Sequence, residues 1–134
     1  MKNFKKFIAT VFLSFSLISL AACFAGSSDT PTFKQITAKE AKEIMDSEKD
    51  CIIIDARTQE EFDEGHIKGA IMIPEYEITQ RAENELPDKN ALILVYCRSG
   101  RRSKIASQAL VSLGYTNVKE FGGIIDWPYE IVNP

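Results

Sequence analysis

Apolar and polar positions follow two alternating periods along residues 37–123. Short apolar runs, rich in β-branched residues and typical of buried parallel strands, occupy residues 51–54, 70–73, 91–96 and 118–121. Apolar residues at helical spacing occur within residues 37–46, 58–64, 78–86 and 105–113. Strands that alternate with helices predict an α/β fold, in which helices cover both faces of a central parallel sheet.

Capping residues and glycines predict several boundaries. Thr37 and Glu40 match a capping box, so the first helix should run from about Thr37 to Asp46. Gly114 stands where a helix-ending glycine belongs, and the pair Gly122–Gly123 is predicted to end the last strand. The buried stripe of the last helix is predicted to contain Ile105, Ala106, Ala109, Leu110 and Leu113.

The first residues have the pattern of a signal peptide. Three lysines precede a stretch of fourteen uncharged residues, 7–20, which is short for a membrane-spanning helix and suits the apolar region of a signal. The stretch ends Leu20-Ala21-Ala22-Cys23, which resembles a bacterial lipobox, whose cysteine is acylated and becomes the first residue after cleavage. An ordinary secretory signal and an uncleaved anchor are the alternatives.

This interpretation divides the chain into a lipoprotein signal peptide at 1–22, a tether at 23–32 and a domain at 33–134. The tether consists mostly of small and polar residues. Lipid on Cys23 predicts a protein held on the periplasmic or cell-surface side of a bacterial membrane. The mature chain, with thirteen basic and nineteen acidic residues, would carry a net charge of −6 rather than −3.

Composition limits the remaining possibilities. The 134 residues are 45% hydrophobic and 26% charged, as in one folded domain. Three cysteines, one histidine and the absence of a C-x-x-C pair exclude a Cys₄ or Cys₂His₂ zinc site within one chain and disfavour a disulfide framework. The acidic net charge disfavours nucleic acid as a partner.

The chemistry is expected at Cys97, where the strongest predicted strand ends and a helix follows. Functional groups gather at the carboxyl ends of parallel strands. The helix N-terminus and the four cations Arg98, Arg101, Arg102 and Lys104 favour the nucleophilic thiolate over the thiol. Cations in a first helical turn cost about 0.3–1 kcal/mol each unless an anion is present to receive them. Cys51, at the start of an apolar run, is expected to be buried and inert.

The loop Cys97-Arg98-Ser99-Gly100-Arg101-Arg102 resembles the Cys-Arg-x-Gly-x-Arg loop of the rhodanese (thiosulfate sulfurtransferase) family. Further segments agree in order with that family: Asp55-Ala56-Arg57 followed by Glu61-Phe62, the run from Gly65 to Pro74, Gly114-Tyr115, and Gly122-Gly123 with Trp127. The resemblance covers about residues 33–134. It implies a rhodanese-like sheet of about five parallel strands with helices on both faces.

The resemblance also implies a two-step transfer. The Cys97 thiolate takes the outer sulfur of a small anionic donor such as thiosulfate, sulfite leaves, and a thiol, a protein or cyanide takes the sulfur from the persulfide. The substrate-binding loop would comprise Arg98, Ser99, Gly100, Arg101, Arg102 and Ser103. Its amides would hold the transferred sulfur, while Arg98 and Arg102 would recognise the donor; the role of Arg101 stays open. We expect a monomer that needs no metal or organic cofactor.

Two other classes of function remain open. A cysteine phosphatase or arsenate reductase places arginine after five intervening residues, where this chain has Ser103, so the loop length favours sulfur transfer. A persulfide or redox sensor, or an interaction module with little turnover, would keep the same loop. The single histidine, His66, and the pair Asp55 and Arg57 are interpreted as structural, because a thiolate favoured by its surroundings needs no separate base.

Overall fold

The computed structural model of the protein describes residues 30–134. The predicted signal peptide, Cys23 and the tether up to residue 29 lie outside the described residues. Five parallel strands form one sheet in the order β1–β5–β4–β2–β3. The strands are β1 Lys34–Gln35, β2 Ile52–Asp55, β3 Ile71–Met72, β4 Ile93–Cys97 and β5 Val118–Gly123. The helices are α1 Ala38–Ser47, α2 Gln59–Glu64, α3 Ile78–Glu85 and α4 Arg101–Ser112, with 3₁₀ turns η1 Glu75–Glu77 and η2 Ile124–Asp126.

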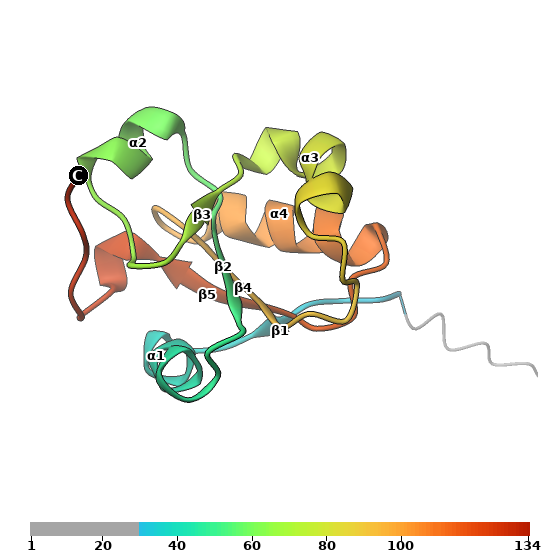
Figure 1. The fold of residues 1–134 in the computed structure, drawn as a ribbon, viewed down its shortest axis with the longest axis horizontal. Helices are drawn as coiled ribbons and strands as arrows, with labels where there is room; N and C mark the ends of the chain where they lie inside the picture. Colours follow the sequence, from blue (N-terminus) through green and yellow to red (C-terminus); the bar gives the residue numbers. More distant parts are fainter. Residues whose placement is uncertain (1–29) are drawn as a thin grey trace, which may run out of the picture.

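Helices cover both faces of the sheet, as predicted. Helices α3 and α4 lie on one face and α1 on the other (Figure 1). The side chains of β4 alternate between these layers: Val95 and Cys97 join the core under α3 and α4, while Leu94 and Tyr96 join the core on the α1 side. Every residue of β4 is buried, so Cys97 ends the most enclosed strand of the sheet.

Capping boxes begin two helices. Before α1, the Thr37 hydroxyl accepts a hydrogen bond from the Glu40 amide at 3.1 Å, and the Glu40 carboxylate accepts one from the Thr37 amide at 2.7 Å, which confirms the predicted start. Thr58 and Glu61 make the same pair of bonds at the start of α2. Gly114 follows the end of α4 with a φ of +97°, the conformation predicted for a helix-ending glycine.

Two predicted details are wrong. Ile105 is 45% exposed, because the buried face of α4 is one position out of register with the predicted stripe and includes Ser103 and Ser107. The pair Gly122–Gly123 does not end β5 but lies inside it. Between the partners Val95–Glu120 and Cys97–Gly123, β5 has one residue more than β4, so Phe121 and Gly122 form a bulge beside the end of β4.

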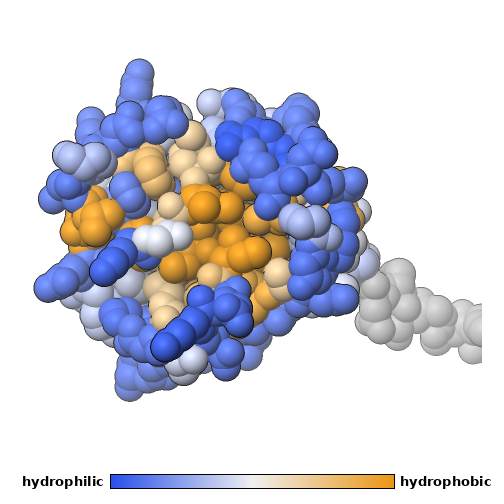
Figure 2. Space-filling model, in the orientation of Figure 1, coloured by the Kyte–Doolittle hydropathy of each residue, from blue (hydrophilic) through white to orange (hydrophobic). Residues whose placement is uncertain are grey.

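Strands β1 and β3 are short strands at the edges of the sheet. The two polar residues of β1 pair with β5 and carry no apolar pattern, which is why the hydropathy of the sequence does not predict them. At the other edge, apolar residues gather in the middle of the face on which β2 and β3 lie, and hydrophilic residues surround them (Figure 2). Ile71 of β3 is 38% exposed.

Within residues 30–134, no helix has the length and apolar character that crossing a bilayer requires.

Candidate active site

Cys97 is the last residue of β4, and three residues separate it from the first residue of α4. Gly100 occupies the N-cap of α4 with a φ of +103°, which turns the chain back so that its own amide donates to the Cys97 Sγ at 3.0 Å. The Ser103 hydroxyl oxygen lies 3.5 Å from the same sulfur. The structure therefore brings Cys97, Gly100 and Ser103 together around one atom.

Two opposing effects act on the pKa of Cys97. Burial raises this pKa, because a thiolate loses water. Hydrogen bonds from the Ser103 hydroxyl and from the amides of Ser103, Gly100 and Ser99 lower it, and their sum prevails. The net pKa is below the ordinary value of a cysteine thiol. Loop amides can donate hydrogen bonds to a thiolate or to an anionic persulfide sulfur. They therefore favour the thiolate of Cys97, as the sequence predicts for this loop.

Gly123 allows the loop to approach β5. Its backbone conformation is extended, so any residue could adopt it, but there is no space for a side chain. An added Cβ would collide with the carbonyl oxygen of Arg98 and would lie 2.6 Å from the Cα of Ser99. The amide of Ile125 donates to the same Arg98 carbonyl at 3.3 Å. The backbone of β5 at Gly123 therefore sets the position of the loop backbone.

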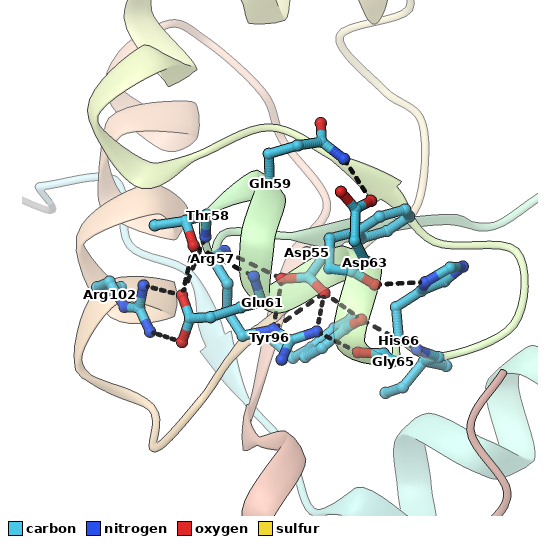
Figure 3. Close-up of polar contacts among 12 residues, drawn as sticks. Asp55, Arg57, Thr58, Gln59, Glu61, Asp63, Gly65, His66, Tyr96 and Arg102 are labelled. Carbon is cyan, nitrogen blue, oxygen red and sulfur yellow. Dashed lines mark hydrogen bonds and ion pairs between the residues drawn. The ribbon is translucent and has the colours of Figure 1, made fainter. Parts of the chain in front are cut away.

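Arg102 lies in the first turn of α4 and is paired with Glu61 of α2 (Figure 3). Its two terminal nitrogens donate to the two carboxylate oxygens at 2.7 and 2.8 Å. Hydrogen bonding to Arg102 is the main reason that the pKa of Glu61 falls to about 2, although partial burial opposes it. The pair fixes the orientation of a guanidinium that the sequence predicts to face the donor. Nothing in the sequence pattern singled out Glu61 as its partner.

The other loop cations are open to solvent. Arg98, Arg101 and Lys104 are exposed, as is Ser99. Arg101, whose role the sequence left open, has no recorded hydrogen bond or ion pair within residues 30–134. These exposed side chains place positive charge beside the loop that holds the buried sulfur.

A buried polar network lies beside the site. Arg57 donates from two nitrogens to the Asp55 carboxylate, the shorter bond being 2.7 Å, and also to the Gly65 carbonyl (Figure 3). The Tyr96 hydroxyl donates to Asp55 at 2.6 Å and accepts from the Ile67 amide at 3.1 Å. Burial, followed by the charge of Asp55, raises the pKa of Tyr96, so it stays a neutral donor. These mutual bonds hold the end of β2 in place.

His66 and Cys51 lack the surroundings of a reactive group. The Nδ1 atom of His66 lies 2.9 Å from the Phe62 carbonyl, and its ring stacks on that of Phe62 with 3.7 Å between centroids. The Phe62 side chain is itself half-buried. Cys51 is also half-buried rather than buried, and it precedes β2 rather than opening it. Burial raises the pKa of Cys51, the opposite of the effect on Cys97.

Sequence reasoning missed Glu120. Its side chain is 2% exposed, and one of its carboxylate oxygens accepts from the Ser103 hydroxyl at 2.6 Å and from the Gly122 amide at 2.8 Å. In the sequence, Lys119 and Glu120 look like an ordinary charged pair in a short strand. Only the bulge after Glu120, which the sequence does not reveal, turns its carboxylate toward the cysteine loop.

A separate cavity lies away from Cys97. It has a volume of about 780 Å³ on the α1 side of the sheet, and its walls include Met45, Ile53, Trp127 and Tyr129. Cys97 belongs to the core on the opposite side of the sheet, and the cavity walls contain no cysteine. Among residues 30–134, no three His, Cys, Asp or Glu side chains are grouped as they would be to hold a metal ion.

Comparison with known proteins agrees with this geometry. The profile of a family described as "Rhodanese-like domain" matches residues 37–128. Thiosulfate sulfurtransferase PspE of Escherichia coli is 42% identical over 73 residues, which are 54% of this chain and 70% of that protein. Thiosulfate sulfurtransferase GlpE of Coxiella burnetii is 33% identical over 96 residues, 71% of this chain and 87% of that protein. A solved structure described as "rhodanese with anions from E. coli" aligns with a TM-score of 0.59 and 38% identity, covering 63% of this chain and 99% of its own.

Proposed function

The chain belongs to the rhodanese-like family and is a rhodanese-type sulfurtransferase. On that premise we propose that it moves the outer sulfur of thiosulfate, or of a similar small anionic donor, to a thiol, a protein or cyanide through a persulfide on Cys97. The observation that carries the proposal is the buried sulfur whose pKa is lowered by the hydroxyl and amides of its own loop. No metal or organic cofactor has a part in this reaction.

Each step uses groups that surround the sulfur. The Cys97 electron pair forms a bond to the outer sulfur of thiosulfate, and the sulfur–sulfur bond of the donor breaks, so that sulfite leaves with the bonding pair. The amides that lower the pKa of Cys97 then receive the charge of the persulfide. Arg98 at the rim and Arg102 on α4 are the cations proposed to attract the dianionic donor and the departing sulfite.

Loop length supports sulfur transfer over phosphate chemistry. Four residues separate Cys97 from Arg102, and the position where a phosphatase loop places its arginine holds Ser103. Ser103 is buried and points back to the sulfur and to Glu120 instead of to an incoming oxyanion. A sensor that keeps the persulfide without turnover would share this geometry, so turnover must be measured.

Mass spectrometry of the purified chain after treatment with thiosulfate tests the proposal. We expect the peptide that contains Cys97 to gain the mass of one sulfur atom and to lose it again when cyanide is added, with one thiocyanate formed per site. An unmodified Cys97 together with hydrolysis of an aryl phosphate would instead indicate a phosphatase. A stable adduct that neither cyanide nor a thiol removes would indicate a sensor.

Replacement of Arg102 by alanine is expected to affect charged donors most. Charged hydrogen bonds contribute about 1.5–3 kcal/mol, so kcat/KM for thiosulfate should fall about 10- to 100-fold. A neutral polysulfide donor should lose much less, because it has no charge to recognise. The Glu61→Gln variant is the matched control, since it keeps the cation but weakens the 2.7 Å brace between α2 and α4. If kcat/KM fell equally for both donors, the role of Arg102 would be only to hold α4 against α2 through Glu61.

We also propose that lipid on Cys23 attaches the protein to a bacterial membrane, on the periplasmic or cell-surface side. Support comes from the order of lysines, apolar stretch and Leu-Ala-Ala-Cys sequence. Two or more acyl chains are needed for stable attachment. The mass of protein recovered from membranes should equal that of a chain that starts at Cys23 and carries those acyl chains. The Cys23→Ser variant should no longer be found in the membrane fraction. A mature chain that begins elsewhere would contradict the proposal.

A further inference from the structure

One hydroxyl group and one carboxyl group continue the line of polar contacts from the sulfur of Cys97. The Ser103 Oγ lies 3.5 Å from the Cys97 Sγ, and the Glu120 Oε1 lies 2.6 Å from that Oγ. The three residues are 1%, 0% and 2% exposed, respectively. A sulfur, a hydroxyl and a carboxylate thus form a line that is shielded from water, and they come from β4, α4 and β5.

The hydroxyl proton of Ser103 has one best acceptor. The oxygens of Gly100 and Gly122 lie 3.0 and 3.4 Å away, but the carboxylate of Glu120 is nearer and is the stronger acceptor. While Cys97 is a thiol, the Ser103 proton points to Glu120 and a lone pair of Oγ accepts from the thiol. Once Cys97 has become a thiolate, the Ser103 hydroxyl donates to the sulfur instead, which is the hydrogen bond that lowers the pKa of Cys97. The resulting order, S–H to O–H to carboxylate, is a path along which a proton can move without entering water.

The surroundings of Glu120 do not provide a cation to neutralise it. No Lys, Arg or His nitrogen described by the structure lies within 4.0 Å of its carboxylate. Titratable groups on the elements packed against β5 include Cys97 and Tyr96 on β4, Lys34 on β1, and Arg101, Arg102 and Lys104 on α4. Tyr96 belongs to the core on the α1 side of the sheet, and from β1 the neutral Gln35 amide donates to the other Glu120 oxygen at 3.5 Å. Lys34, Arg101 and Lys104 are exposed, and Arg102 is paired with Glu61. Two anions here would repel each other in a dry site, so the Glu120 carboxylate is placed to accept the proton that Cys97 gives up.

We propose that Glu120 is a positioning residue that accepts the thiol proton of Cys97 through Ser103 as the sulfur attacks its donor. The S–H bond breaks and its proton moves to the Ser103 Oγ, while the hydroxyl proton moves to the Glu120 Oε1. The electron pair left on Cys97 forms the bond to the donor sulfur, and sulfite leaves with the pair of the broken bond. When the acceptor takes the outer sulfur, Cys97 regains its pair and the protons return along the same path.

This proposal rests on the sulfurtransferase function and predicts a particular pH profile. Because the proton of Cys97 passes to Glu120 rather than to water, the wild-type chain forms reactive thiolate below the pKa of Cys97, and the rate levels off there. Without the carboxyl, the proton must go to water, and the rate falls about tenfold for each pH unit below that pKa. Above it, Cys97 is ionised in both proteins and the rates converge.

Single-turnover rates of persulfide formation from thiosulfate, measured from about pH 5.5 to about pH 9.5, test this prediction. Glu120→Gln keeps the size of the side chain and should lower the rate about 10- to 100-fold at acid pH and less than about threefold at alkaline pH. Ser103→Ala should give the same shape, and the double variant should be no slower than the slower single variant. Glu64→Gln on exposed α2 is the matched control and should follow the wild-type profile.

Three outcomes would overturn the proposal. The same loss at every pH would mean that Glu120 only holds the loop. An unchanged rate would mean that it has no role. A faster rate at acid pH would mean that it acts only as a negative charge, which raises the pKa of the thiol. If Ser103→Ala does not fold, as seen by circular dichroism, the Glu120→Gln profile decides alone.

Alkylation separates this proposal from the function itself. If the wild-type chain forms no persulfide, the proposed function fails whatever Glu120 does. The rate at which iodoacetamide modifies Cys97, followed on its peptide over the same pH range, still reports whether Glu120 accepts the thiol proton. We expect wild type to react faster than Glu120→Gln below the pKa of the thiol, and coincident profiles would refute the proton path.

Discussion

The Cys97→Ala variant is expected to form no measurable thiocyanate from thiosulfate and cyanide. Removal of a covalent nucleophile takes away the persulfide itself, so the rate should fall at least about 1,000-fold. The fold should survive, because alanine fills most of the space of a buried cysteine that contacts the core under α3 and α4. Thiocyanate assays and thermal unfolding of the same preparation provide the two measurements.

Cys51 is the natural control. It is half-buried, and burial raises the pKa of its thiol, so it is a poor nucleophile at neutral pH. The Cys51→Ala variant should keep most of the activity. An active Cys97→Ala variant, or a folded Cys51→Ala variant without activity, would mean that the nucleophile is assigned to the wrong residue.

The Gly123→Ala variant should lose nearly all activity although Gly123 is not a reacting residue. The added Cβ would meet backbone atoms of Arg98 and Ser99, which cannot rotate away as a flexible side chain could. The loop must move, and a displacement of about 1 Å in a catalytic group can cost about 100-fold in rate. Overpacking of this kind also lowers the free energy of unfolding by about 1–3 kcal/mol. Denaturant unfolding and the thiocyanate assay measure the two effects.

The neighbouring Gly122 offers a control, because a side chain there would strain the backbone without meeting other atoms. Gly122 has a φ of +91°, which disfavours side chains, but nothing lies within 4 Å of an added Cβ. The Gly122→Ala variant should therefore lose about 1–2 kcal/mol of stability from backbone strain and keep more activity than Gly123→Ala. The space argument would be refuted if both variants lost the same activity.

Local patterns in the sequence predict the layers of the fold and the position of the nucleophile. The run from residue 91 to residue 96 is apolar throughout, so a central strand covered on both faces was its only good explanation. The capping box at Thr37 and the glycine at position 114 depend on neighbouring residues alone, and both predictions are confirmed. Cys97 follows from the same reasoning, because its position at a strand end is a local property.

Features that depend on distant partners could not be predicted. Ile105 is apolar, but the register of α4 against the sheet leaves it in solvent and places two serines inside. Glu61 and Arg102 are far apart in the sequence and meet only because α2 lies beside the start of α4. Glu120 looks like a surface residue until the bulge in β5 is known. In each case tertiary contact overrides the local pattern.

The burial of Cys97 means that the reactivity of its sulfur and the access of other molecules to that sulfur are set independently. A thiolate with a lowered pKa reacts readily with disulfides and oxidants, which abound wherever thiols are exchanged. Yet the Cys97 side chain is only 1% exposed, so a bulky disulfide cannot bring its own sulfur into line with it. A donor as small as thiosulfate is not held back in this way. The loop therefore works as a size filter, which protects a reactive sulfur from side reactions with larger molecules.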